Sequence, residues 1–229
     1  MKTIKNITIG ISVILFFFIV NSIAILPFEI LNIDYNKLPM YIKTIYLVFY
    51  DITIITVLFL IYLKRIKNDF TDFKKNNIYY LENYIKYWFI ALGLMILSNA
   101  LIMFFTDSIA GNQEAINELF NRNPFYIFFS AVLIAPITEE IVFRLSFRYI
   151  FKNDWLFIIM SGLSFGFIHI LSAESILNEL IFLIPYSIPG MIFAYVLVKS
   201  KNIFVPIGLH FIHNGFLMSL KVLSLIIGV

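Results

Sequence analysis

Long apolar segments recur along the whole chain and limit what it can fold into. A helix that crosses a bilayer needs about 20 mostly apolar residues. The chain is 61% hydrophobic and 14% charged, whereas soluble proteins are roughly 45–50% apolar and roughly 25% charged. A soluble fold could not bury this much apolar surface, so we predict an all-α fold, a polytopic transmembrane helical bundle of about seven spans. The predicted spans are Ile7–Leu26, Tyr41–Leu63, Tyr84–Phe105, Pro124–Ile150, Trp155–Leu171, Ile176–Val198 and Ile203–Ile227.

The absence of cysteine and the small net charge exclude several other classes of protein. No cysteine means no disulfide framework and no Cys-based zinc or iron–sulfur site. A net charge of +3 is too small to indicate nucleic-acid binding. The predicted partner is therefore the lipid bilayer.

Basic residues are concentrated between alternate spans, which predicts the orientation of the chain. The other loops carry mostly acidic residues. Because basic loops mark the cytoplasmic side, we predict a multi-pass protein of the cell membrane with a cytoplasmic N-terminus and an external C-terminus. The basic residues are Lys2, Lys5, Lys64, Arg65, Lys67, Lys74, Lys75, Arg144, Arg148, Lys152, Lys199 and Lys201.

Residues 1–24 allow a second interpretation. Lys2, Lys5, an apolar run and the Ser-Ile-Ala sequence at 22–24 resemble a cleaved signal peptide. The apolar run is long for such a peptide, and its removal would leave Tyr41–Leu63 to insert first. We favour a retained span, with cleavage as the alternative.

Two adjacent glutamates, Glu139 and Glu140, lie in the middle of the fourth span, which also carries a helix-breaking Pro136. Carboxylates inside a bilayer cost about 2.5 kcal/mol or more each, and are normally paired, protonated or directed into a wet cavity. Neighbouring helix positions point about 100° apart, so the two glutamates cannot share one environment. Glu140 and Arg144 have the spacing of an ion pair, which leaves Glu139 free. Alternatively, both glutamates serve only helix packing, with Arg144 and Arg148 as partners.

All three histidines lie in the fifth and seventh spans. His210 and Asn214 are four residues apart and share a helix face, while His213 is offset from them. At 1.5 Å per residue, Glu139 lies roughly 16 Å and His169 roughly 20 Å from the cytoplasmic ends of their spans. His210 to Asn214 lie roughly 10–17 Å from theirs. These side chains can therefore meet at one depth.

Such a set of side chains supports more than one hydrolytic arrangement. A carboxylate near an imidazole can deprotonate water for attack on a carbonyl, and a histidine N–H and an asparagine amide can stabilise the oxyanion. The glutamate and two histidines could instead ligate zinc. A Ser164–His210 dyad is a third arrangement, which leaves the paired glutamates and Asn214 unexplained. The small residues around Ser164 more simply predict close helix packing.

The polar loop Asp107–Asn123 is where we divide the chain. It separates N-terminal transmembrane spans, residues 1–106, from a catalytic transmembrane core, residues 124–229. Two non-enzymatic alternatives are a proton or ion transporter, which predicts internal repeats that we do not find, and an idle scaffold such as an immunity or regulatory protein.

Three motifs in the second half resemble those of the CAAX prenyl protease and bacteriocin-processing (CPBP, also called Abi) family. The resemblance covers about Phe125 to Leu217, and it is specific because the motifs occur in order on predicted membrane helices. Residues 1–106 match only as generic spans. Glu139-Glu140-x-x-x-Arg144 resembles the EExxxR motif of the family, Phe165-x-x-x-His169 its FxxxH motif, and His210-x-x-x-Asn214 its HxxxN/D motif.

The resemblance implies an intramembrane protease of the CAAX type with 124–229 as its core. Glu139 and His169 would activate water, His210 and Asn214 would form the oxyanion hole, and Glu140 and Arg144 would support the site. The cofactor is either none or a divalent metal such as zinc, for which the ligands would be Glu139, His169 and His210. The implied substrate is a membrane-associated precursor, either a CAAX-type protein, a bacteriocin or a peptide pheromone, with bacteriocin self-immunity or peptide maturation as the role. His213 has no place in this scheme.

Overall fold

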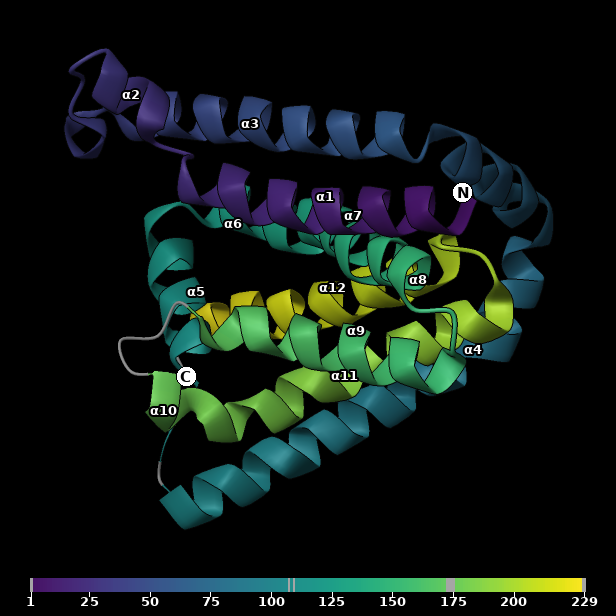
Figure 1. The fold of residues 1–229 in the computed structure, drawn as a ribbon. Coiled ribbons are helices and arrows are strands. Elements are labelled where there is room, and N and C mark those ends of the chain that lie inside the picture. Colours follow the sequence, from purple (N-terminus) through teal and green to yellow (C-terminus); the bar gives the residue numbers. More distant parts are fainter. Residues whose placement is uncertain (1, 107, 109, 172–175, 228–229) are drawn as a thin grey trace.

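The computed structural model describes residues 2–106, 108, 110–171 and 176–227, which form helices joined by short connections (Figure 1). No strand occurs in these ranges, and the all-α prediction is confirmed. The elements in chain order are α1 (Lys2–Ser22), α2 (Leu26–Ile30), η1 (Tyr35–Lys37), α3 (Met40–Ile61), α4 (Leu63–Thr106), α5 (Gly111–Arg122), α6 (Pro124–Phe129), η2 (Ser130–Ile134), α7 (Ala135–Glu139), η3 (Glu140–Ser146), α8 (Phe147–Ile150), α9 (Asp154–Ile170), α10 (Ile176–Glu179), η4 (Leu180–Phe182), α11 (Leu183–Ser200) and α12 (Phe204–Ile227).

Six helical stretches of the described chain are long and apolar enough to cross a membrane, and α9 is a shorter apolar helix. With 17 residues, α9 is about 25 Å long, a little less than the hydrocarbon thickness of about 30 Å. The bundle predicted from the apolar segments is thus observed, with one short member. The six stretches are Ile4–Ser22, Met40–Ile61, Leu63–Thr106, Pro124–Ile150, Ile176–Ser200 and Phe204–Ile227.

Two segments that we expected to be loops are helical. The basic segment between the second and third predicted spans belongs to α4, whose backbone departs from helical angles at Asn76 (φ −121°). An ion pair between Arg65 and Asp69 (2.8 Å) supports this segment, because residues four apart lie on one helix face. Likewise, α5 occupies most of the predicted loop Asp107–Asn123. Polarity excluded these segments from the apolar spans, but it does not prevent a segment from being helical.

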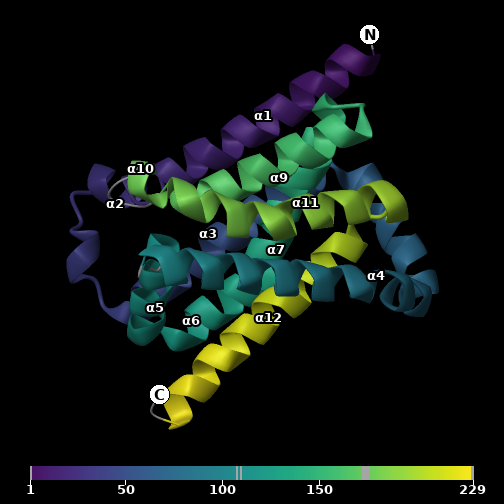
Figure 2. The ribbon, with the colours of Figure 1, turned by 90° about the horizontal axis from the view of Figure 1, so that it is seen from below.

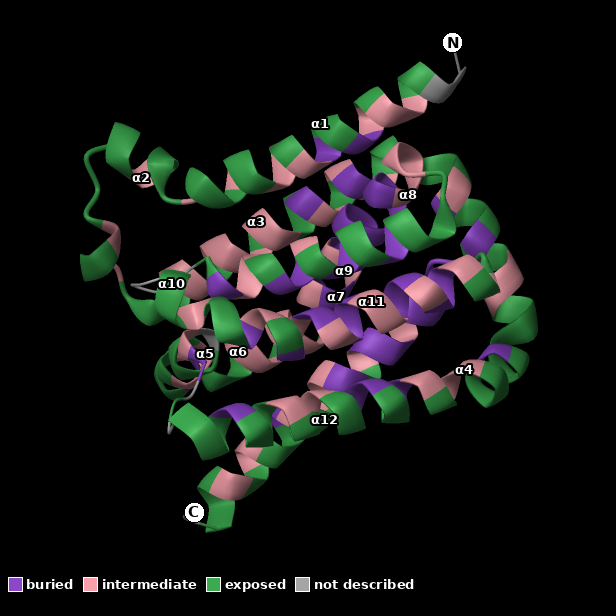
Figure 3. Ribbon diagram, turned by 60° about the horizontal axis from the view of Figure 1, so that its bottom comes forward, coloured by how far each residue is buried: buried purple, intermediate pink, exposed green. Residues whose placement is uncertain are grey.

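Buried residues are concentrated in the middle of the bundle, on η3, α9 and α11 (Figure 3). On one side of these elements lie α1 and α3, and on the other side lies the second half of α4 (Figures 1 and 2). The helix α1 packs against η3 and α8, whereas α4 packs against α11 and α12. The outer helices expose large apolar side chains, for example Phe104 at 79%, as expected of surfaces that face lipid.

Glycines bring α9 and α11 together in the most extensive helix pair of the fold. A Cβ atom added to Gly162 would lie 2.2 Å from the side chain of Met191, and one added to Gly166 would lie 2.3 Å from the hydroxyl of Ser187. A Cβ atom on Gly190 would lie 2.8 Å from the carbonyl oxygen of Gly162. The prediction that small residues here allow close helix packing is confirmed.

Polar contacts fix the turn between α11 and α12 to α4. Asn202 donates to the carbonyl oxygen of Asp69 and to a carboxylate oxygen of Asp72, both at 2.8 Å. The backbone N–H of Ile203 donates to the Asp69 carboxylate at 3.0 Å. His210 follows about two helical turns later, so these contacts fix the start of the helix that carries it.

Candidate active site

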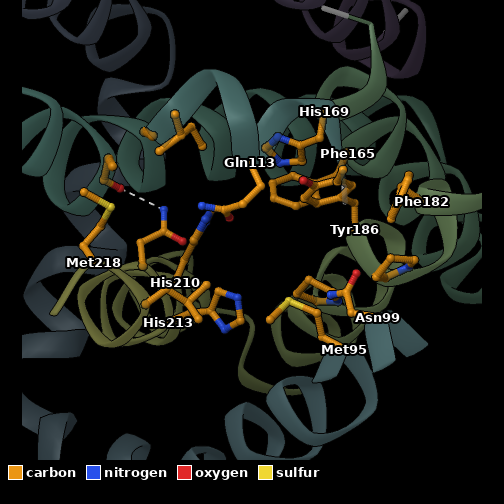
Figure 4. Close-up of a pocket in the computed structure, with 18 of the residues that line it drawn as sticks. Met95, Asn99, Gln113, Phe165, His169, Phe182, Tyr186, His210, His213 and Met218 are labelled. Atoms are coloured by element: carbon orange, nitrogen blue, oxygen red, sulfur yellow. Dashed lines mark hydrogen bonds between the residues drawn. The ribbon is translucent and has the colours of Figure 1, made fainter. Parts of the chain in front are cut away.

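One cavity of about 630 Å³ is lined by the polar side chains that the sequence predicted to be catalytic. Glu139 comes from the end of α7, His169 from α9, and His210 and Asn214 from α12. His213 lines the same cavity. In Figure 4, His169 lies on one side of the open space and His210 on another. The structure thus brings the four side chains predicted to be catalytic to a single cavity.

Glu140 and Arg144 form a completely buried ion pair, as their spacing predicted. Both side chains are 0% exposed, and Arg144 Nε lies 3.0 Å from Glu140 Oε2. Arg144 Nη2 donates to Glu140 Oε1 at 3.1 Å, and Nη1 donates to Ser161 Oγ at 3.2 Å. The guanidinium carbon is 4.7 Å from the centroid of the Phe165 ring. Only the Nη2–Oε1 contact is a hydrogen bond, whereas Arg144 Nε and Glu140 Oε2 form none. Together with the hydrogen bond to Ser161, the ion pair ties η3 to α9.

His210 lies between the two glutamates. Its Nδ1 is 3.0 Å from Glu140 Oε1, and its Nε2 is 3.8 Å from Glu139 Oε2. An Arg-paired carboxylate only accepts hydrogen bonds, so the Nδ1 atom of His210 carries a hydrogen. The carboxylates differ in burial as expected, with Glu139 15% and Glu140 0% exposed. We did not expect that one imidazole would contact both, because helix spacing within the fourth span says nothing about α12.

Asn214 is held by a carbonyl group that Pro136 leaves without a backbone partner. In the π-helical segment η2, the N–H of Ala135 bonds the carbonyl of Ser130, five residues earlier. In that register the carbonyl of Ala131 would bond the N–H of residue 136, but proline has none. Asn214 Nδ2 instead donates to Ala131 O at 2.8 Å. The irregularity predicted at Pro136 is thus a π-helical change of register, and it orients the Asn214 amide.

Phe165 belongs to the FxxxH motif and lines the cavity, although the motif assigned it no role at the site. Its ring centroid lies 4.9 Å from that of His169 and 5.6 Å from that of His210. The His169 ring is also 4.8 Å from the ring of Tyr186, on α11. The four-residue spacing of Phe165 and His169 was the available signal, since it puts both on one helix face, whereas nothing in the sequence indicated Tyr186.

The N-terminal half of the chain also contributes to the cavity. Its wall includes Met95, Asn99 and Met103 of α4, together with Gln113 and Ile116 of α5. The three motifs lie outside these segments, which carry no predicted site residue. They reach the cavity because α4 packs against α11 and α12 and α5 packs against α6 and α9.

The zinc set of Glu139, His169 and His210 does not fit a metal ion in this arrangement. Within the described residues, no group of three His, Asp or Glu side chains is placed to hold an ion. One ring nitrogen of His210 already contacts Glu140.

Ser164 lies apart from the cavity. It is half-buried on α9 and is not among the described residues that line the cavity. Both ring nitrogens of His210 face glutamates. The alternative Ser164–His210 dyad is therefore not formed in the part of the chain that the structure describes.

Comparisons with known proteins agree with the motifs. The family model described as type II CAAX prenyl endopeptidase Rce1-like matches residues 121–216. The chain is 29% identical to the putative membrane peptidase YdiL of Bacillus subtilis over 48% of this chain and 43% of that protein. It is 31% identical to the UPF0177 protein YbdI of Lactococcus lactis over 53% of this chain and 70% of that protein. It is also 31% identical to the membrane-embedded CAAX protease MroQ of Staphylococcus aureus over 52% of this chain and 48% of that protein.

The chain thus matches less than half the length of YdiL and of MroQ. No solved structure gives a significant match. The segment matched by the family model contains the EExxxR, FxxxH and HxxxN motifs, whose side chains line or support the cavity. The chain belongs to the CAAX prenyl protease and bacteriocin-processing family.

Proposed function

We propose that this chain is an intramembrane endopeptidase that hydrolyses a peptide bond of a membrane-associated protein or peptide precursor. The observation that carries the proposal is the single cavity lined by Glu139, His169, His210 and Asn214. A carboxylate, imidazoles and an amide in one largely apolar cavity supply a base and oxyanion donors for hydrolysis. The named activities of YdiL and MroQ, a putative peptidase and a protease, support the same reaction class.

In the proposed mechanism, Glu139 and His169 hold a water molecule, and Glu139 takes one of its protons. The water oxygen attacks the scissile carbonyl carbon, and the carbonyl electrons move onto oxygen. The resulting oxyanion accepts hydrogen bonds from His210 and Asn214. The C–N bond then breaks, and the proton held by Glu139 passes to the leaving amine.

Glu140 and Arg144 act by holding His210. A carboxylate behind an imidazole fixes its orientation and stabilises the imidazolium, as the aspartate does in serine hydrolases. The contact between His210 Nδ1 and Glu140 has this geometry. Protonated His210 then has a second N–H, on Nε2, which donates to the oxyanion. Arg144 is the buried ion-pair partner of Glu140 and holds it in place behind His210.

We propose residues 124–229 as the catalytic core and residues 1–106 as spans that complete the cavity wall through α4. The proposed substrates are a CAAX-type protein, a bacteriocin or a peptide pheromone precursor, with a role in peptide maturation or bacteriocin self-immunity. The proposed location is the cell membrane, with the N-terminus in the cytoplasm. Peptidomics of membranes from cells that carry the wild type or Glu139→Gln identifies the precursor.

The function is tested with purified protein in liposomes and that precursor. Glu139→Gln keeps size and hydrogen bonding but removes the base, so we expect cleavage to fall about 10²–10⁴-fold with the protein folded. His169→Ala should have a comparable effect. Ser164→Ala is the matched control and should cleave at the wild-type rate. An active Glu139→Gln protein together with an inactive Ser164→Ala protein would refute the mechanism and favour a serine dyad.

A further inference from the structure

His213 has no role in the proposed mechanism, yet it lies in the wall of the same cavity. It is only 5% exposed and comes from α12, as His210 does. Figure 4 shows its ring beside the open space, on the side where Met95 and Asn99 of α4 lie. His213 is thus a polar side chain in the cavity wall that takes no part in the proposed reaction.

The polar atoms of His213 have no partner among the described residues. No described hydrogen bond joins either ring nitrogen to another residue. Nδ1 is fully buried, whereas Nε2 is not, so Nε2 is the ring nitrogen that a molecule in the cavity can reach. Its ring neighbour is Phe193, at 6.3 Å between centroids. Buried polar groups are normally paired, and an unpaired one destabilises the fold. An apolar side chain would fill this position at lower cost, so the histidine indicates a partner that is not part of the chain.

The backbone of a bound peptide carries the hydrogen-bond donors and acceptors that such a partner needs. A neutral imidazole offers one donor and one acceptor, as a peptide unit does. A peptide that enters a cavity inside a bilayer loses water, and its N–H and C=O groups need new partners. On this side of the cavity, Met95 and Phe193 are apolar and provide none, which leaves His213 and Asn99 as the polar side chains.

The position of His213 on α12 places this contact close to the scissile bond. His213 lies three residues after His210, which is about 4.5 Å along the helix. An extended peptide advances about 3.3 Å per residue. Resting on the proposed peptidase function, we propose that His213 binds substrate by hydrogen-bonding its backbone one or two residues from the scissile carbonyl.

The test measures binding without turnover, in the Glu139→Gln protein reconstituted in liposomes. The probe is a fluorescently labelled apolar decapeptide of leucine and alanine, because a backbone contact does not depend on side chains. His213→Leu should weaken the Kd about tenfold, the size of one hydrogen bond. His213→Gln keeps a donor and an acceptor and should recover most of the affinity. In the active protein, His213→Leu should raise KM for the native precursor more than it lowers kcat, as loss of uniform binding does.

Trp88→Phe is the matched control. Trp88 also has a buried ring nitrogen without a partner, but it is not among the residues that line the cavity. Its replacement should leave the Kd unchanged. An unchanged Kd in His213→Leu would overturn the proposal, and so would a fall in kcat with unchanged Kd and KM. A lower melting temperature with normal peptide affinity would show a purely structural role. An active Glu139→Gln protein would instead refute the proposed function, while the binding measurement would still report on His213.

Discussion

Replacement of Arg144 by methionine tests whether this arginine supports the fold or contacts substrate. Methionine keeps much of the length of the side chain but removes the two contacts to Glu140 and the hydrogen bond to Ser161. Glu140 is then a carboxylate with 0% exposure and no cationic side chain beside it except a protonated His210. Loss of one partner of a buried ion pair costs about 3–5 kcal/mol in the free energy of unfolding.

For a chain of this length, a cost of that size lowers the melting temperature by about 10 °C, since 1 kcal/mol corresponds to about 2–4 °C. The assay is thermal unfolding of purified protein in detergent, with activity per folded molecule measured in parallel. The double variant Glu140→Gln/Arg144→Met removes both charges and should regain stability to within about 1 kcal/mol of the wild type. It should nevertheless cleave about 10²–10⁴-fold more slowly, because His210 loses its orienting carboxylate. A stable but inactive Arg144→Met protein would refute the structural role and place the arginine on the substrate.

Three further predictions concern the supporting structure. Pro136→Ala restores a backbone N–H that can bond the carbonyl of Ala131, and this bond would free the Asn214 amide. We expect cleavage to fall by up to about 10²-fold with no loss of thermal stability. Unchanged cleavage would contradict the positioning role. Asn202→Ala removes one buried and one partly buried hydrogen bond and should lower the free energy of unfolding by about 2 kcal/mol, which denaturant titration measures. Reporter fusions after Lys152 and after Asn117 should report the cytoplasm and the exterior, respectively, and the opposite result would invert the proposed topology.

Local patterns were sufficient to predict the class of fold and a set of polar side chains that line one cavity. Apolar runs of spanning length predicted the helical bundle, because lipid leaves a backbone few alternatives to the helix. Spacing along one helix predicted the Glu140–Arg144 pair, which the structure confirms. The motifs predicted which side chains would meet, and Glu139, His169, His210 and Asn214 do line one cavity. The prediction of loops for two polar segments was wrong, because these segments are helical in α4 and α5.

Contacts between helices were decided by the tertiary structure alone. His210 reaches Glu140 from 70 residues away along the chain, and Asn214 reaches the carbonyl of Ala131 from 83 residues away. Hydropathy and helical spacing describe one helix at a time, whereas these contacts depend on how closely two helices approach and at what rotation. That approach is set by features such as the glycines between α9 and α11 and the contacts of Asn202 with α4. The sequence by itself determined the helical class and the candidate residues for the chemistry, and the packing of the helices decided which atoms face one another.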